Sequence, residues 1–227
     1  MPRTKLKDRL LPVYTKGEEI FNMVSHIVGG AFAICALVLC VVVAALNGNV
    51  WGVVSGAIYG ATMIVLYTMS SIYHGLRPEM PKKVFQVIDH CSIYFLIAGT
   101  YTPIAIGGQI RQENPVLAWV MFGIVWACCA LGVTLTAIDL RKYRVFSMVC
   151  YIVMGWLIVF MIQPVLQVLP LAAFLWLLAG GIFYTVGSVL YGIGKKKRWM
   201  HSVFHLFVLL GSILQFVSIL VYIMPAA

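Results

Sequence analysis

Charge is scarce in this sequence. Charged residues make up 10% of the 227 positions, whereas hydrophobic residues make up 62%. A soluble domain carries about 25% charged residues, so this composition excludes a soluble domain as the main part of the chain. Acidic residues are scarcest, with 7 Asp and Glu against 16 Lys and Arg. We therefore expect a protein that resides in lipid.

Long polar segments are also missing, because almost the whole chain divides into apolar stretches. A membrane-spanning helix needs about 20 mostly apolar residues. Lipid offers no partners to free backbone groups, so such spans are expected to be helices. The sequence predicts an all-α, polytopic membrane protein with a basic N-terminal arm over residues 1–17 and one seven-transmembrane-helix bundle over 18–227. The predicted spans are 24–46, 50–74, 84–107, 115–137, 145–164, 167–193 and 200–224.

Positive charge is nearly absent from one side of the predicted bundle. Of the 16 Lys and Arg, only Arg111 falls on that side; the others fall in the arm and after the second, fourth and sixth spans. Cytoplasmic connections carry the excess of Lys and Arg, so we expect a cytoplasmic N-terminus and an outside C-terminus in the cell membrane. The net charge of +9 then reflects topology and attraction to anionic headgroups. No soluble basic face remains, and we expect no nucleic-acid partner.

Neither a disulfide framework nor a cleaved leader is indicated. The six cysteines fall within or at the ends of spans, as expected of small packing residues. The apolar run Ile27–Leu46 is longer than the apolar core of a typical signal peptide, and no small-residue cleavage site precedes a soluble domain. We expect the first span to stay attached.

Histidine is absent from the outer side of the predicted bundle. Ionisable groups at the edge of a bilayer core are costly, which makes each one a candidate functional residue. His201 and His205 are four residues apart, a spacing that lets two imidazoles on one helical face bind one metal. This segment lacks the glutamate of the His-Glu-x-x-His metalloprotease motif, so a general base would come from another helix. The five histidines, all near predicted cytoplasmic ends, are His26, His74, His90, His201 and His205.

His74, at the end of the second span, is the natural third ligand. Three histidines and a water are the pattern of a catalytic zinc site. Ser70 lies one turn before His74 on the same face. Asp89 opens the third span at matching depth, where it would either take a proton from the water or orient a histidine. Neighbouring helical residues point about 100° apart, so Asp89 and His90 do not easily face one ion, and we choose Asp89.

These residues also have plainer interpretations. A single histidine at a membrane interface is more often a headgroup contact or a satisfied packing residue than a ligand. Four candidates at one depth with ligand spacing are hard to produce by packing alone, so for the set we favour metal binding. Glu19, Asn22 and His26 share helical spacing and are interpreted as a polar helix start, where acidic residues suit the positive end of the dipole.

Several motifs together resemble the bacterial hemolysin III family, within the progestin and adipoQ receptor group that includes the adiponectin receptors. The resemblance runs from about residue 18 to the C-terminus and is specific in motif order and spacing. It implies a seven-helix protein with a cytoplasmic N-terminus and a zinc ion near the cytoplasmic face. The implied ligands are His74, His201 and His205, with Asp89 and Ser70 nearby. The motifs are Glu18–His26, Ser70–His74, Asp89–Tyr94, Ala98–Pro103, Met154–Trp156 and His201–His205.

The chain departs from the animal receptors of that group. It lacks their long soluble N-terminal region and its outer connections are minimal, so no protein hormone is expected as a partner; membrane lipids are. The group is related to membrane hydrolases that include alkaline ceramidases. This kinship implies a lipid amide or ester as substrate, by analogy of fold and site.

Three functions are compatible with the sequence. The first is a zinc-dependent intramembrane hydrolase in which Asp89 removes a proton from water and Ser70 hydrogen-bonds an oxyanion or orients His74. The second is a non-enzymatic, zinc-stabilised regulator or sensor of membrane lipid state. A pore-forming cytolysin, suggested by the family's name, ranks lowest, because seven committed spans suit a resident membrane protein and no secretion signal is expected. The sequence does not separate the first two.

Overall fold

A computed structural model describes residues 3–194 and 197–225, and all regular structure in them is helical. The predicted all-α fold is confirmed. Among the described residues, five helices are long and apolar enough to cross a membrane: α1, α2, α5, α9 and α10 with its extension η2. The elements are η1 (Leu6–Asp8), α1 (Lys16–Leu46), α2 (Val50–Gly75), α3 (Glu79–Ile106), α4 (Gln109–Glu113), α5 (Pro115–Ile138), α6 (Arg144–Gly155), α7 (Leu157–Phe160), α8 (Ile162–Val168), α9 (Leu171–Gly194), α10 (Met200–Ser218) and the π-helical η2 (Ile219–Ile223).

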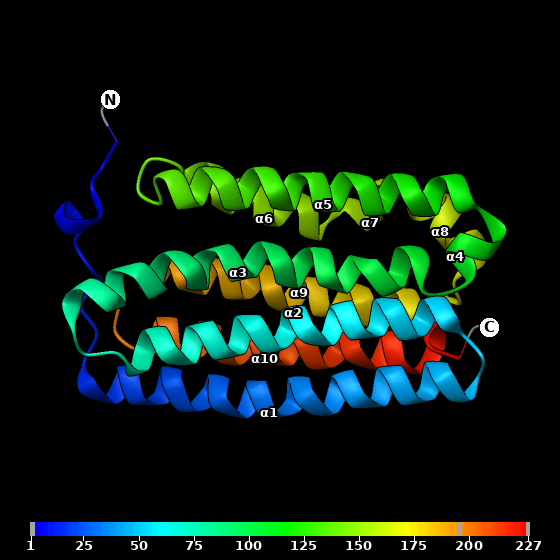
Figure 1. The fold of residues 1–227 in the computed structure, drawn as a ribbon, viewed down its shortest axis with the longest axis horizontal. Helices are drawn as coiled ribbons and strands as arrows, with labels where there is room; N and C mark the ends of the chain where they lie inside the picture. The colour runs from blue at the N-terminus through cyan, green and yellow to red at the C-terminus, as the bar shows by residue number, and fades with distance from the viewer. Residues whose placement is uncertain (1–2, 195–196, 226–227) are drawn as a thin grey trace.

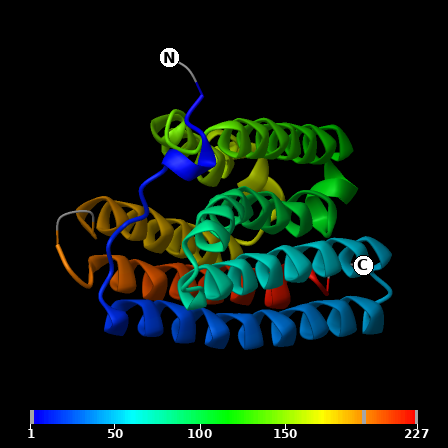
Figure 2. The same cartoon turned by 60° about the vertical axis from the view of Figure 1, so that its left-hand side comes forward.

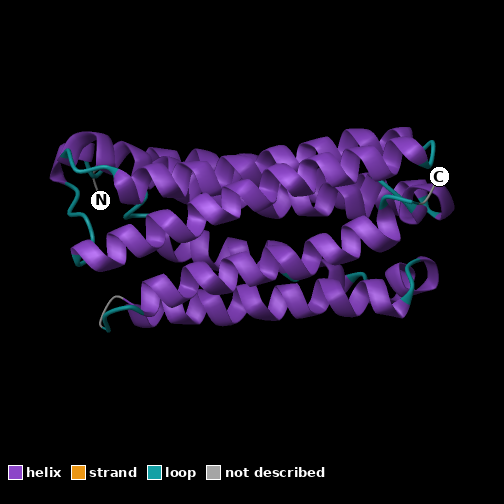
Figure 3. Cartoon of the chain, turned by 90° about the horizontal axis from the view of Figure 1, so that it is seen from below, coloured by secondary structure: helices purple, strands orange, loops and turns teal. Residues whose placement is uncertain are grey.

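The long helices run side by side along the length of the molecule (Figures 1 and 3). The axes of helix α3 and of the row formed by α6, α7 and α8 lie alongside those of the five apolar helices. Successive long helices along the chain run in opposite directions. One end therefore gathers the beginnings of α1, α3, α6 and α10 and the ends of α2, α5 and α9. We call it the basic end, because the described Lys and Arg other than Arg111 lie there.

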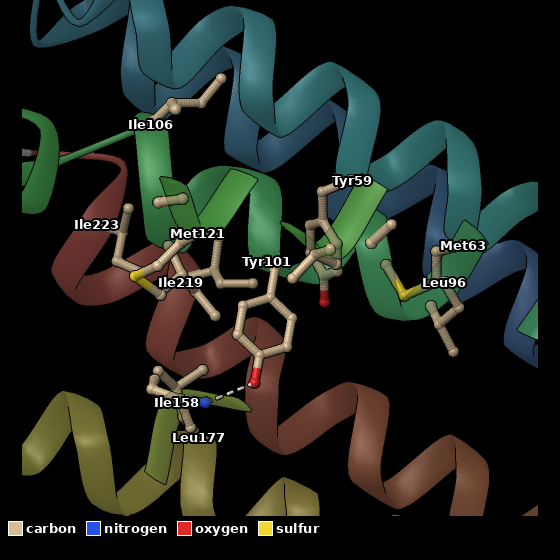
Figure 4. Packing of buried hydrophobic residues seen from close by; sticks show 14 of the residues in the cluster. Tyr59, Met63, Leu96, Tyr101, Ile106, Met121, Ile158, Leu177, Ile219 and Ile223 are labelled. Atoms are coloured by element: carbon tan, nitrogen blue, oxygen red, sulfur yellow. Dashed lines mark hydrogen bonds between the residues drawn. The ribbon is translucent and has the colours of Figure 1, made fainter. Parts of the chain in front are cut away.

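The fifth predicted span is helical but not continuous. Non-helical backbone at Trp156 and Met161 divides it into α6, α7 and α8. At the first break, the Tyr101 hydroxyl of α3 accepts a hydrogen bond from Ile158 N at 2.9 Å (Figure 4). The same hydroxyl donates to Gly155 O at 3.1 Å. A buried backbone group without a partner is costly, so this tyrosine stabilises the interruption. The connection between the fifth and sixth predicted spans, residues 165–166, is instead part of α8.

Helices α1 and α2 approach closely through small residues. Ala33, Ala36 and Cys40 on α1 are fully buried. At Gly60 of α2, a Cβ would overlap the Leu37 side chain and lie 2.7 Å from its Cα. The glycine therefore allows backbone-to-backbone contact, as is common between membrane helices.

Gly60→Ala is expected to destabilise the bundle by about 1–3 kcal/mol, because the added methyl group meets backbone that cannot move independently. The measurement is the unfolding midpoint in detergent. Gly123→Ala on α5 is the matched control, since a Cβ there meets nothing within 4 Å. Equal midpoints for the two variants would contradict the close approach of α1 and α2.

The N-terminal arm crosses the basic end of the bundle (Figure 2). Thr4 N donates to Asp139 Oδ2 at 2.7 Å, and Lys83 Nζ donates to Lys7 O at 2.8 Å. Burial opposes charge on Asp139, but backbone hydrogen bonds, from Thr4 foremost, hold the pKa of this carboxyl below its usual value. The arm is thus fastened to α3 and to the turn between α5 and α6, rather than lying free.

Helix α1 begins inside the predicted arm, at Lys16, where Thr15 and Glu18 form a reciprocal capping box. Glu18 Oε1 also accepts from Trp199 N at 2.6 Å, immediately before α10 begins. This contact ties the start of α10, with its two histidines, to the start of α1. Of the basic run predicted as a topology signal after the sixth span, Lys195 and Lys196 lie outside the described residues.

Candidate metal centre

Three histidines from two helices meet at the basic end of the bundle. His74 is in the last turn of α2, and His201 and His205 are in the first two turns of α10. His201 Nε2 lies 3.4 Å from His74 Nε2 and 3.2 Å from His205 Nε2. All three residues are buried, with exposed fractions of 3%, 7% and 1% for His74, His201 and His205. The structure therefore brings together the three histidines that the sequence predicted as ligands.

The geometry of these nitrogens fits a metal ion. Zinc–nitrogen bonds of about 2.0–2.1 Å in a tetrahedron separate neighbouring ligand atoms by about 3.3–3.4 Å. The Nε2–Nε2 separations of His201 from His74 and from His205 are close to that value, and one ligand atom from each ring lies within 4.8 Å of the others. Three buried imidazoles with ligand nitrogens this close together form a donor set typical of zinc. The cluster could hold a metal ion, and its three protein ligands leave a fourth position for water or substrate.

Glu19 of α1 orients the first of these rings. Its Oε2 lies 2.6 Å from His74 Nδ1, and its Oε1 lies 2.8 Å from Lys82 Nζ. When Nδ1 donates to the carboxylate, Nε2 is the unprotonated nitrogen and its lone pair points to the cluster. Carboxylates beside metal-binding histidines commonly fix the tautomer and raise the basicity of the ring in this way.

Glu19→Gln is expected to weaken metal binding by about 10–100-fold, because the amide no longer fixes the tautomer as a carboxylate does. Competition against a chromogenic chelator measures the affinity. Glu79→Gln is the control: Glu79 also pairs with a lysine at the basic end, but it is exposed and contacts none of the three histidines. An unchanged affinity in Glu19→Gln would show that the Glu19–His74 contact serves packing only.

Two further residues of α1 lie against the cluster. The His26 ring is 3.9 Å from the His205 ring, centroid to centroid, and Asn22 is fully buried one turn away. The side-chain nitrogens of His26 and the amide atoms of Asn22 are buried without a hydrogen-bond partner. The interpretation of Glu19, Asn22 and His26 as a polar helix start was therefore incomplete. Their shared face was the available signal, because a polar stripe on a lipid-embedded helix needs a polar neighbour.

Tyr14, at the end of the arm, covers the cluster. Its ring stacks on His201 with centroids 4.8 Å apart and planes 19° from parallel, and lies 5.8 Å from the His74 ring. Burial, with further contributions from Tyr191 and Glu19, raises the pKa of the Tyr14 phenol, so it keeps its proton. Sequence reasoning missed this residue, because nothing in an irregular arm predicts where its side chain packs.

A largely apolar cavity of about 160 Å³ adjoins the histidines. Asp89 and Ser70 line it together with His201 and His205, and deeper in the bundle its wall continues along α3, α7, α9 and α10. Asp89 is not one of the residues in the three-ligand cluster. The structure thus places Asp89 and Ser70 in the same cavity as two of the histidines, while their catalytic roles stay predictions.

His90 is engaged elsewhere. Its Nδ1 lies 2.8 Å from Gln86 O, and its Nε2 lies 3.4 Å from the Tyr191 hydroxyl. Asp89 Oδ2 is 3.5 Å from the same Nδ1. Within the described part of the chain, His90 is not a member of the ligand cluster. Both Asp89 and His90 line the cavity beside His201 and His205, so the choice of Asp89 over His90 stays a prediction.

The fold and the cluster define a helical membrane protein with a candidate metal centre of three histidines at one end of its bundle. The profile of the family described as Haemolysin-III related matches residues 14–216, and the chain belongs to this family. The resemblance inferred from the motifs is confirmed.

Relatives match over most of their length. Hemolysin-3 of Bacillus cereus is 37% identical over 92% of this chain and 94% of its own. The Hemolysin-3 homolog of Bacillus subtilis (strain 168) is 36% identical over 92% and 96%. Monocyte to macrophage differentiation factor of Homo sapiens is 26% identical over 78% of this chain and 74% of its own. The similarity therefore extends from bacteria to animals.

Proposed function

We propose that this protein is a zinc-dependent hydrolase of the cell membrane that cleaves an amide or ester bond of a lipid from the cytoplasmic side. One observation carries the proposal: three buried histidines converge with the spacing of zinc ligands beside a largely apolar cavity that Asp89 and Ser70 also line. An apolar cavity with a few convergent polar groups is the usual form of a small-molecule site.

The proposal includes seven membrane crossings with a cytoplasmic N-terminus. Helix α3 has 28 residues, and the row α6–α8 runs along the same bundle, so both have the extent of a span beside the five strongly apolar helices. Lys and Arg gather at the basic end, whereas Arg111 on α4 lies at the other. The positive-inside rule then makes the basic end, and with it the metal centre, cytoplasmic.

The residues of the site have distinct tasks in this proposal. A zinc ion held by the three histidines supplies Lewis acidity and lowers the pKa of water at the site. Asp89 accepts the proton of the attacking water and later returns it to the leaving group. Ser70 donates a hydrogen bond to the carbonyl oxygen as negative charge develops there. Glu19 keeps His74 oriented, and the apolar walls hold the acyl chain and exclude bulk water.

The experiment is a screen of the purified protein in lipid nanodiscs against lipid amides and esters, with released fatty acid detected by mass spectrometry. We expect release that stops on chelation and returns with added zinc. Zinc-loaded protein that turns over neither class of lipid would contradict the hydrolase proposal.

A second function, a metal-stabilised regulator or sensor of lipid state, is favoured by the placement of the site across three helices. The candidate ligands come from α2 and α10, and the contact of Glu19 with His74 connects α1 to the site. A metal there would clamp these helices together. This function predicts that chelation lowers the unfolding temperature although no lipid is hydrolysed. A pore-forming role, suggested by the names of the bacterial relatives, predicts instead liposome leakage that persists without the histidines.

A further inference from the structure

We infer that the basic end of the bundle contains a second site, an anion-binding pocket for a phosphate group, formed by the N-terminal arm around Arg9. The pocket is separate from the three-histidine cluster. Its existence does not depend on the proposed hydrolase activity.

The pocket lies between the arm, the start of α3, the turn joining α5 to α6, and the end of α9. It has a volume of about 460 Å³. Three arginines contribute to its wall, one from the arm and two from the α5–α6 turn and the start of α6, and no Asp or Glu of the described residues does. The polar part of the wall includes Arg9, Arg141, Arg144, Tyr14 and Gln86.

Arg9 is the residue that points to a ligand. Its exposed fraction is 5%, and its Nε and Nη1 are buried without a hydrogen-bond partner. Burying a guanidinium without an opposite charge is strongly unfavourable. Arg9 forms no ion pair with any described carboxylate, and the nearby Asp139 already accepts from the backbone of Thr4, Arg141 and Lys142. A bound anion would satisfy the two nitrogens that the protein leaves unpaired.

The chemistry of the wall favours phosphate over a simple carboxylate. A guanidinium presents two parallel N–H groups that match two oxygens of a phosphate. Arg141 and Arg144 are exposed at the rim and add positive charge that suits an anion of more than one charge. Tyr14 and Gln86 offer uncharged donors within the same wall. The phosphate could belong to a lipid headgroup or to a free phosphate compound, and these two sources share this chemistry.

The pocket adjoins the metal centre. His90 and Tyr191 line both cavities, and Tyr14, which lines the anion pocket, stacks on His201. A lipid with its phosphate at Arg9 could therefore extend its chain toward the apolar cavity. This last step, unlike the pocket itself, rests on the proposed function.

The test uses full-length protein purified in phosphate-free buffer and placed in phosphatidylcholine nanodiscs. Two probes are added separately: inorganic phosphate in solution, and phosphatidic acid in the nanodisc. The readout is the unfolding temperature as a function of probe concentration. Arg9→Gln is expected to raise the half-saturating concentration at least about tenfold, the loss typical of a charged hydrogen-bonding partner. Arg77→Gln, which removes an exposed arginine of the same end that does not line the pocket, is expected to leave it within about twofold.

The outcomes separate the two sources. A response to inorganic phosphate that Arg9→Gln weakens supports a site open to free phosphate compounds, and a response to phosphatidic acid alone supports a headgroup site. No response to either probe, or equal responses in Arg9→Gln and Arg77→Gln, would overturn the inference. If Arg9→Gln does not fold, Arg144→Gln is used instead, because Arg144 is exposed and lines the same pocket. This variant is also expected to bind the phosphate probes more weakly than the wild type. The phosphate response should survive in His201→Ala/His205→Ala, so the anion pocket and the proposed hydrolase can fail independently.

Discussion

Asp89→Asn is expected to slow lipid hydrolysis by about 10²–10⁴-fold while the metal stays bound, because the amide cannot accept a proton from water. Asp89 lines the cavity beside His201 and His205 but is not a member of the ligand cluster. The substitution preserves size and shape, so it separates proton transfer from packing. The measurements are initial rates of fatty-acid release on the lipid that the screen identifies, and zinc content of the same samples.

Asp8→Asn serves as the control for Asp89→Asn. Asp8 is an exposed carboxyl of the arm, and the change removes the same charge away from the cavity. Its rate is expected to equal that of the wild type. Full activity in Asp89→Asn would remove Asp89 as the general base. Loss of zinc together with activity would instead make Asp89 a residue that supports the metal centre.

His201→Ala/His205→Ala is expected to reduce the metal content from about one ion per chain to near zero, because one histidine alone does not retain a divalent metal through purification. The two histidines are separated by one helical turn and their Nε2 atoms lie 3.2 Å apart. Elemental analysis of chelator-free preparations measures the content. Any hydrolase activity should disappear with the metal.

His90→Ala is the matched control for the double variant. His90 lies at the same end of the bundle, but its ring nitrogens face Gln86 O and the Tyr191 hydroxyl. Its metal content should equal that of the wild type. Metal that persists in His201→Ala/His205→Ala, or is lost in His90→Ala, would mean that the ion binds elsewhere.

The positions of the long apolar helices were predictable from hydropathy. Features of the fold that depend on tertiary contacts were less predictable. Apolar stretches predicted α1, α2, α5, α9 and α10 closely, because span length and lipid exposure constrain them directly. The interruptions at Trp156 and Met161 were not predicted, because the segment stays apolar, although Gly155 precedes the first break and Pro164 follows the second. The stability of the first interruption depends on Tyr101, which is far away in sequence and supplies hydrogen-bond partners to Gly155 and Ile158.

In the candidate site, too, some residues were predictable from the sequence and others depend on tertiary contacts. The four-residue spacing of His201 and His205 and the position of His74 at the end of a span predicted their convergence, because helix geometry and membrane depth fix both. The Glu19–His74 contact depends on how α1 rotates against α2, which the sequence does not specify. Tyr14 depends on the path of an irregular arm, which hydropathy does not constrain.

Zinc K-edge X-ray absorption of the wild-type protein, purified without chelators, tests whether His74, His201 and His205 hold one zinc ion. We expect about three imidazole nitrogens at about 2.0–2.1 Å and one further light ligand from water or substrate. A preparation without zinc, or a zinc ion bound by cysteine sulfur at about 2.3 Å, would contradict it.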